Sequence, residues 1–283
     1  MKLGLFFTAG EGAADIAEVA RAAEAKGFGS LWVGEHVLIP ERYERVYPAS
    51  ESGEPPEYAG LLSSPLIALA RAAAVTERLE IGTGICLLPL REPITLAKDI
   101  ATLDRDCGGR FLFGVGAGWM REETEILGGD FDRRWRQIAD SVAAMKTLWR
   151  DDVSEHDGPY TRFPRVRMHP KPHRRPHPPI LLGGASPRIF DRIAAWADGW
   201  IPGVTSVAEV REGREQLFVA TAARGRDPDT LTLVAFGLPG VLREPSELAA
   251  LAELGVQHAT VWLDERDERV FAEIDALADR TLG

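Results

Sequence analysis

The chain has 283 residues and a formal net charge of −10, and these two values already exclude several classes of protein. The length is short for two domains and close to the roughly 250 residues of a barrel built from eight β/α units. The excess of acidic residues argues against a nucleic-acid partner, because binding a phosphate backbone requires a basic face.

The first apolar run and the two cysteines indicate the cellular compartment of the protein. Residues 2–7 form an apolar run that is too short for the core of a signal peptide or for a membrane span. Cys86 and Cys107 show no CxxC spacing, so free thiols are expected rather than a redox or zinc motif. We therefore predict a cytoplasmic protein without a membrane partner.

Short apolar runs alternate with helical patterns along the whole chain. An Ala-rich periodic stretch follows the first run and ends before Gly27, since a glycine just after the last periodic residue stops a helix. Ser64 and Pro65 supply an N-cap and a proline at the first helical position. Strands are predicted at residues 2–7, 30–33, 79–88, 110–115, 180–182, 199–201, 231–236 and 257–263. Helices are predicted at residues 13–26, 65–78, 93–106, 131–150, from 187, 207–223, 245–254 and 267–278.

Eight β/α units without a second core predict an α/β fold, a single (β/α)8 TIM barrel that forms one domain over residues 1–283. An open, doubly wound sheet is the alternative. Two insertions interrupt the rhythm, residues 38–63 after the second strand and residues 151–179 before the fifth. Loops that follow strands lie at the C-terminal face of a barrel, where barrel enzymes keep their chemistry. We therefore expect the first insertion to cover the active site.

The second insertion carries three histidines at intervals of four residues, His169, His173 and His177. On a helix this spacing would gather possible metal ligands on one face. The many prolines of the segment rule out a helix, and its basic residues would repel a metal ion. We interpret the segment as an extended lead-in to the fifth strand and predict no metal site.

The barrel rule points to Glu35 and His36, which directly follow the second strand. Carboxylates and imidazoles both transfer protons, so the pair suits acid–base chemistry beside a redox centre. The alternative is a hydrogen-bonded pair that only anchors the loop. The insertion that follows contains residues suited to an aromatic or anionic substrate, or to a solvated loop: Arg42, Tyr43, Arg45, Tyr47 and Tyr58.

Three glycine-containing turns lie at the ends of neighbouring strands. The turn after the fifth strand opens a helix and suits a phosphate, because backbone N–H groups are exposed at the positive end of the helix dipole. The turn after the fourth strand is no dinucleotide fingerprint, since Trp119 stands where a third glycine is needed. A glycine inside the third strand indicates a bulge or a close approach by a ligand. Tight turns and close packing are the alternatives. The residues are Thr83, Gly84, Ile85; Gly116, Ala117, Gly118, Trp119; and Gly183, Gly184, Ala185, Ser186.

Several stretches resemble the luciferase-like monooxygenase superfamily. They are residues 27–40 (GFGSLWVGEHVLIP), 80–89 (EIGTGICLLP), 97–110 (AKDIATLDRDCGGR), 114–123 (GVGAGWMREE), 178–186 (PPILLGGAS) and 198–200 (DGW). Within the superfamily the chain is most similar to the deazaflavin-dependent branch of actinobacterial type.

The resemblance implies coenzyme F420 as cofactor, or FMN as in other branches, and a homodimer. It implies a non-prolyl cis peptide at Gly84–Ile85 behind the cofactor ring, and Glu35 and His36 close to the reacting ring carbon. The residues from Gly116 to Trp119 would approach the ring edge. Gly183, Gly184, Ala185 and Ser186 would bind the cofactor phosphate.

The sequence thus predicts an enzyme that transfers a hydride between a deazaflavin and a small organic substrate. His36 or Glu35 would exchange a proton with the substrate. An FMN-dependent monooxygenase is the alternative within the same class, and a non-catalytic protein that binds the cofactor is the alternative from another class. A metal-dependent hydrolase is disfavoured, because the first strand has no HxH pair to bind a metal ion.

Overall fold

A computed structural model describes residues 1–44, 47 and 53–282 of the chain. In these residues parallel strands close into a barrel, because β11 pairs with both β9 and β12 and β12 pairs with β1. The predicted (β/α)8 barrel is therefore confirmed. Its strands are β1 (Lys2–Phe6), β2 (Ser30–Val33), β3 (Glu80–Thr83), β4 (Cys86–Leu87), β5 (Phe111–Gly116), β8 (Ile180–Gly183), β9 (Gly199–Ile201), β10 (Gly203–Val204), β11 (Thr232–Gly237) and β12 (His258–Trp262).

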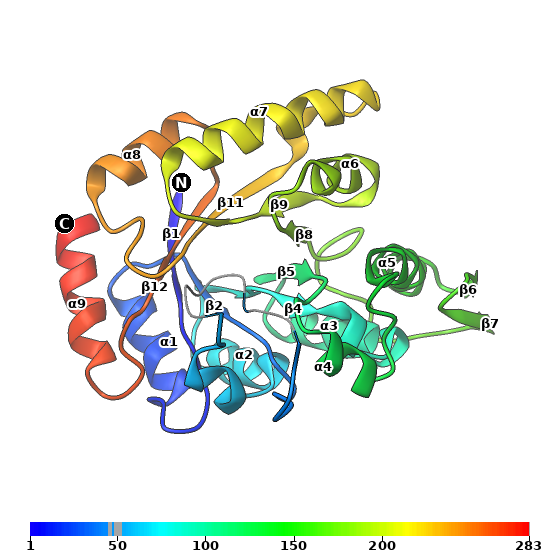
Figure 1. Ribbon diagram of the computed structural model, residues 1–283, viewed down its shortest axis with the longest axis horizontal. Helices are drawn as coiled ribbons and strands as arrows, with labels where there is room; N and C mark the ends of the chain where they lie inside the picture. Colours follow the sequence, from blue (N-terminus) through cyan, green and yellow to red (C-terminus); the bar gives the residue numbers. More distant parts are fainter. Residues whose placement is uncertain (45–46, 48–52, 283) are drawn as a thin grey trace.

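Helices surround the strands on all sides (Figure 1). None of the helices in the described part of the chain is both long and apolar enough to cross a membrane. The helices are α1 (Ile16–Ala25), α2 (Pro65–Ala74), α3 (Pro93–Asp106), α4 (Arg121–Ile126), α5 (Arg134–Arg150), α6 (Pro187–Trp196), α7 (Val207–Ala223), α8 (Pro245–Glu253) and α9 (Val270–Thr281). The described residues also form short 3-10 turns between strands and helices, η1 (Glu57–Leu61), η2 (Leu88–Leu90) and η3 (Pro228–Thr230).

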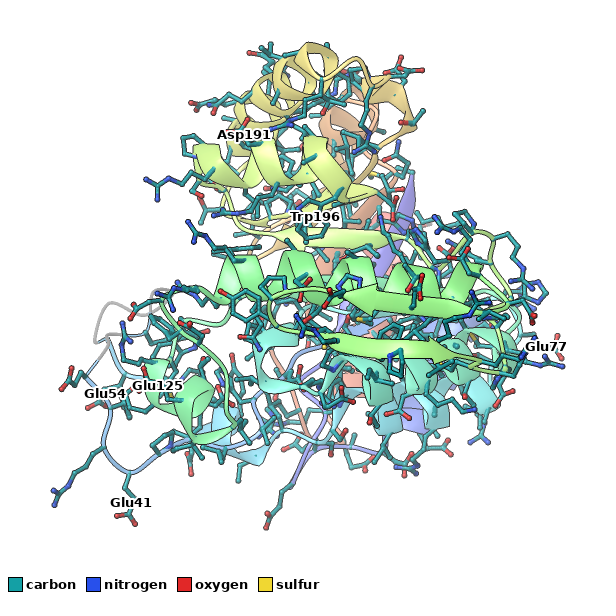
Figure 2. All side chains as sticks on the ribbon, turned by 90° about the vertical axis from the view of Figure 1, so that its right-hand side faces the viewer. Glu41, Glu54, Glu77, Glu125, Asp191 and Trp196 are labelled. Carbon is teal, nitrogen blue, oxygen red and sulfur yellow. The ribbon has the colours of Figure 1, made fainter. Side chains whose placement is uncertain are left out.

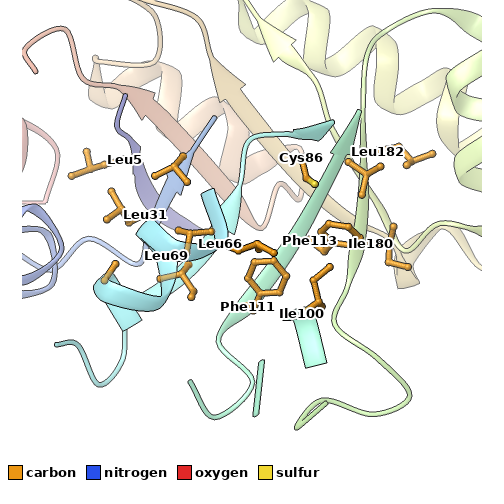
Figure 3. Close-up of a cluster of buried hydrophobic side chains, with 14 of the residues drawn as sticks. Leu5, Leu31, Leu66, Leu69, Cys86, Ile100, Phe111, Phe113, Ile180 and Leu182 are labelled. Atoms are coloured by element: carbon orange, nitrogen blue, oxygen red, sulfur yellow. The ribbon is translucent and has the colours of Figure 1, made fainter. Parts of the chain in front are cut away.

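Alternate strand residues build two separate cores, because successive side chains of a strand point to opposite faces. Residues such as Leu31 and Phe113 belong to the larger core between the strands and the helices (Figure 3). Trp32 belongs to the smaller core of the barrel interior, where it is fully buried. A Cβ atom on Gly82 would stand 2.3 Å from the Trp32 ring, so glycine is required at that strand position.

The predicted strand 79–88 is interrupted in the structure. The peptide bond between Gly84 and Ile85 is cis, as the resemblance implied, and it separates β3 from β4. β3 and β4 both pair with β5, so the interruption lies inside the barrel wall rather than at its edge.

The second insertion contains an antiparallel hairpin that sequence analysis did not predict. β6 (Ser154–Asp157) pairs with β7 (Arg162–Val166) outside the barrel, at the right of Figure 1. The Asp140 carboxylate of α5 accepts hydrogen bonds from Nε2 of His156 at 2.8 Å and from the backbone N–H of Thr161 at 2.7 Å. Asp140 of α5 therefore holds the hairpin in place. The polar sequence of the hairpin itself gives no strand pattern from which it could be predicted.

The first insertion lies at the C-terminal end of the barrel, as expected. Figure 2 shows Glu41 and Glu54, both from this insertion, at the same end of the molecule as Glu125 of α4. Glu77, in the turn before β3, lies at the opposite end. Arg45 falls outside the described residues.

The N-terminal end of the barrel holds a buried histidine whose titration makes stability depend on pH. Burial lowers the pKa of His258 to about 4, against the opposing influence of Glu80, while Lys2 and Arg174 lower it further. The unfolded chain takes up the proton near the ordinary pKa of about 6.5. Stability from the neutral imidazole is therefore fully present above that pH and is lost as the pH falls towards 4.

We expect the free energy of unfolding to fall by about 2 kcal/mol more in the natural protein than in His258→Gln between pH 7 and pH 4.5. Urea unfolding of both proteins at the two pH values measures the difference. The comparison cancels other groups such as Asp104, whose pKa burial raises. Equal losses in the two proteins would contradict the assignment.

Candidate active site

Glu35 and His36 follow β2 directly, but their side chains have different partners. The fully buried Glu35 carboxylate accepts hydrogen bonds from the backbone N–H of Leu87 and from Nε of Arg91, both at 2.7 Å. Leu87 ends β4, so this carboxylate ties the end of β2 to the segment after the cis peptide. Glu35 therefore forms a buried ion pair with Arg91, whereas the imidazole of His36 has a different carboxylate as its partner.

His36 pairs with a carboxylate that is distant in sequence. Its Nδ1 lies 2.8 Å from Oε2 of Glu123, in α4, whose side chain is 2% exposed. The other oxygen of Glu123 accepts the backbone N–H of Val37 at 2.7 Å and that of Leu38 at 3.3 Å. One buried carboxylate therefore fixes both the imidazole and the backbone that follows it.

Trp119 defines the protonation of the imidazole. Its Nε1 lies 3.3 Å from Nε2 of His36, and an indole N–H can only donate. Nε2 of His36 is therefore the acceptor, and Nδ1 carries the proton that is donated to Glu123. This hydrogen-bond pattern places the lone pair of the ring on Nε2, where it accepts the indole N–H of Trp119.

Ile85 lies where the ends of three strands meet. A Cβ atom on Gly116 of β5 would stand 1.8 Å from Cδ1 of Ile85, and one on Gly183 of β8 would stand 3.1 Å from it. These glycines therefore make room for the half-buried Ile85 side chain. A Cβ atom on Gly34, after β2, would lie 3.8 Å from the carbonyl oxygen of Gly84. The ends of β2, β3, β5 and β8 converge, as the sequence analysis expected.

The other residues predicted around the cofactor ring differ in accessibility. Thr83 is fully buried and its hydroxyl donates to the carbonyl oxygen of Gly114 at 2.7 Å, so its side chain joins β3 to β5. Ala117 is buried, while Gly118 and Trp119 are half-buried. Gly118 has a φ of +72°, a conformation that favours glycine, and it turns the chain from β5 towards Trp119.

The turn between β8 and α6 is open to solvent. Gly184, Ala185 and Ser186 are exposed, and Gly184 has a φ of +109°. Nε1 of Trp200 donates to the carbonyl oxygen of Gly184 at 2.6 Å and holds the turn. Ser186 is the N-cap of the ten-residue helix α6, and its hydroxyl makes no hydrogen bond to that helix. The turn therefore offers a hydroxyl and a helix N-terminus to a ligand.

A cavity of about 450 Å³ borders His36. It lies between the loop after β2 and the N-terminal ends of α2 and α3, and its lining includes His36, Val37, Ser64, Leu90, Arg91 and Thr95. Its lining includes none of the glycines that follow β3, β5 and β8. Within residues 1–44, 47 and 53–282, no group of three or more His, Cys, Asp or Glu side chains is placed to hold a metal ion.

Comparison of the chain with models of known protein families shows the family to which it belongs. Residues 1–280 match the model of the luciferase-like monooxygenase family. The chain belongs to this family. Family membership makes it an oxidoreductase.

Relatives within the luciferase-like family cover most of the chain. An uncharacterised protein of Mycobacterium tuberculosis is 35% identical over 258 residues, 88% of this chain and 87% of that protein. An FMNH2-dependent dimethylsulfone monooxygenase of Pseudomonas putida is 30% identical over 211 residues, 74% of this chain and 53% of that protein. The structure of a coenzyme F420-dependent tetrahydromethanopterin reductase from Methanopyrus kandleri superposes with a TM-score of 0.76 at 14% identity, covering 99% of this chain and 98% of that one.

Sequence reasoning missed two residues that complete the site of this luciferase-like protein. Glu123 and Arg91 are separated from their partners by 87 and 56 positions, so no local spacing indicates either pairing. Glu123 does lie in the segment after β5, which the barrel rule points to. A search of that segment for carboxylates would have found it.

Proposed function

We propose that the protein is a coenzyme F420-dependent oxidoreductase, in which the bound deazaflavin exchanges a hydride with a small organic substrate. The observation that carries the proposal is the dyad of His36 and Glu123 at the barrel mouth, beside the cis peptide at Gly84–Ile85. Hydride transfer to or from an oxygen-bearing carbon requires a proton donor or acceptor in the same site. His36 supplies that group.

The residues at the mouth fit the ring of such a cofactor. Ile85 presents a half-buried apolar surface at the mouth. Gly116 and Gly183 have no side chains, and this leaves the space that the Ile85 side chain occupies. A flat ring system gains binding free energy from burial against an apolar surface of this kind. Ile85 is thus assigned to the back of the ring, with Gly118 and Trp119 at its edge.

The turn after β8 fits the cofactor phosphate. Gly184, Ala185 and Ser186 are exposed at the N-terminal end of α6, and the Ser186 hydroxyl is free of the helix. Anions are stabilised at such a helix end by the unpaired N–H groups and by the helix dipole. These residues are assigned to the phosphate.

The chain's own acid–base chemistry centres on Nε2 of His36. When a substrate hydroxyl is oxidised, it takes the place of the Trp119 N–H at Nε2, which then accepts the substrate proton. Glu123 stabilises the resulting imidazolium through the Nδ1–H bond. When a carbonyl is reduced, the same atom returns the proton to the oxygen. Glu35 and Arg91 act as positioning residues, because their ion pair holds the loop that carries His36.

An FMN-dependent monooxygenase is the second candidate, favoured by the 30% identity to the FMNH2-dependent enzyme of Pseudomonas putida. This chain spans 98% of the F420-dependent reductase and 99% of a monooxygenase from Streptomyces bottropensis, so the oxygen dependence of turnover has to separate the two candidates. Turnover without oxygen uptake is expected for the deazaflavin enzyme, whereas oxygen uptake that matches turnover would favour the monooxygenase.

A fluorescence titration with coenzyme F420 and FMN side by side tests the cofactor assignment. We expect saturable quenching of the deazaflavin and weaker binding of FMN. Gly184→Ala should weaken deazaflavin binding at least roughly tenfold, because it disturbs the phosphate turn. Gly225→Ala is the matched control, since Gly225 also has a positive φ of +74° but lies in the turn after α7. Tight FMN binding without deazaflavin binding would refute the proposal.

A further inference from the structure

Three of the chain's four tyrosines lie in the insertion between β2 and α2, and all three contact tryptophans at the barrel mouth. The ring centroid of Tyr47 lies 5.2 Å from that of Trp119, and the centroid of Tyr43 lies 6.2 Å from it. Tyr58 lies 6.3 Å from Trp262, centroid to centroid. These five rings, here called the aromatic wall, form one group around Trp119, after β5, and a second group around Trp262, at the end of β12.

Both groups of the aromatic wall reach the proposed catalytic centre. In the first group, Trp119 lies 5.9 Å from the ring centroid of His36. In the second, Trp262 packs against Phe236 at 6.1 Å, and a Cβ atom on Gly84 would stand 2.7 Å from the Phe236 ring. One group of the aromatic wall therefore lies beside the imidazole assigned to proton transfer, and the other lies near the cis peptide.

Among the described residues, the charged groups that contact the aromatic wall or His36 are engaged or negative, and Arg42, next to Tyr43 in the sequence, is exposed to solvent. Arg91 is neutralised by Glu35, and Glu123 places a carboxylate next to His36. Arg266 lies over Tyr58, 5.6 Å from its ring centroid, and its Nε and Nη2 donate to backbone carbonyl oxygens.

The tyrosines of the aromatic wall are themselves neutral. Burial raises the pKa of the Tyr47 and Tyr58 hydroxyls, so both stay protonated at neutral pH. A negatively charged substrate would exchange water for neutral rings and a nearby carboxylate, which costs free energy.

We propose that the substrate is an uncharged aromatic molecule, bound against Tyr47, Tyr58 and Trp262 with its reacting carbon towards His36. This inference rests on the proposed function, because it takes the space between His36 and Gly84 to be the reaction site. Sequence alone left an aromatic substrate, an anionic substrate and a solvated loop as alternatives. The ring contacts of the tyrosines and the engaged cations favour the aromatic one.

Benzamide and benzoate test the inference, since they share a planar shape and differ in charge. Calorimetric titration of the F420-loaded protein should give a dissociation constant at least roughly tenfold lower for benzamide than for benzoate. Tyr47→Ala and Tyr58→Ala should each weaken benzamide binding roughly 2- to 10-fold, the usual contribution of one aromatic contact. Tyr160→Ala is the matched control, because Tyr160 lies in the hairpin outside the barrel, and it should leave binding unchanged.

Three results would overturn the inference: no benzamide binding to the loaded protein, equal or tighter binding of benzoate, or no effect of either tyrosine substitution. Tighter benzoate binding that is lost in Arg266→Gln would identify an anionic substrate instead. Parallel titrations with the FMN-loaded protein separate this inference from the proposed function. A preference for benzamide with FMN bound and no deazaflavin binding would refute the cofactor assignment and leave the aromatic site standing.

Discussion

Replacing His36 by Ala is expected to lower the turnover of the F420-loaded protein by about 10²–10⁴-fold while leaving deazaflavin binding largely intact. The reason is that Nε2 of His36 is the group assigned to exchange the substrate proton. The proposed cofactor contacts, at Ile85 and at Gly184–Ser186, are made by other strands. Turnover measured by deazaflavin absorbance and binding measured by fluorescence give the two quantities separately.

Two controls distinguish a proton-transfer role from a structural one. Added imidazole should restore part of the turnover of His36→Ala, because a small base can occupy the vacated space. His156→Ala removes an imidazole that is also 2.8 Å from a carboxylate, that of Asp140, but lies in the outer hairpin, and it should leave turnover unchanged. Unchanged turnover in His36→Ala would remove His36 from the mechanism and favour a protein that only binds the cofactor.

Replacing Arg91 by Met is expected to destabilise the fold by about 3–5 kcal/mol. The Glu35 side chain is fully buried, and Arg91 is the cation that neutralises it, with Nε at 2.7 Å. Without Arg91 the carboxylate keeps the hydrogen bond from Leu87 but loses its charge partner. Urea unfolding followed by circular dichroism measures the loss.

An exposed ion pair supplies the matched control. Arg71 pairs with Asp15, with side-chain exposures of 53% and 45%, so Arg71→Met should cost no more than about 1 kcal/mol. Replacing both Glu35 and Arg91 by Met should recover much of the stability, since no uncompensated charge remains buried. If Arg91→Met and Arg71→Met cost the same, the buried pair does not hold the loop as described.

The barrel was predictable because its strands and helices differ in hydrophobic period along the whole chain. Helix α7 has the predicted bounds, 207–223, since Ser206 caps it and polar residues follow it. The hairpin of β6 and β7 was not predictable. Its strands are largely polar or exposed, and it is held by Asp140 from another element.

The site was predictable where backbone position alone matters and not where side-chain partners matter. Strand ends located His36 and the turn at Gly184, because every β/α barrel gathers these ends at one face. Adjacency in sequence groups His36 with Glu35, although Glu35 pairs with Arg91. Successive residues project in different directions, and the partner of His36, Glu123, comes from the segment after β5, on another side of the mouth.

A crystal structure of the protein with coenzyme F420 bound tests the central claim most directly. The account predicts the ring system against Ile85, the phosphate at Gly184–Ser186, and Nε2 of His36 open to the face of the ring that is left for substrate. A ring in the cavity between α2 and α3, or a phosphate bound away from the N-terminal end of α6, would contradict it.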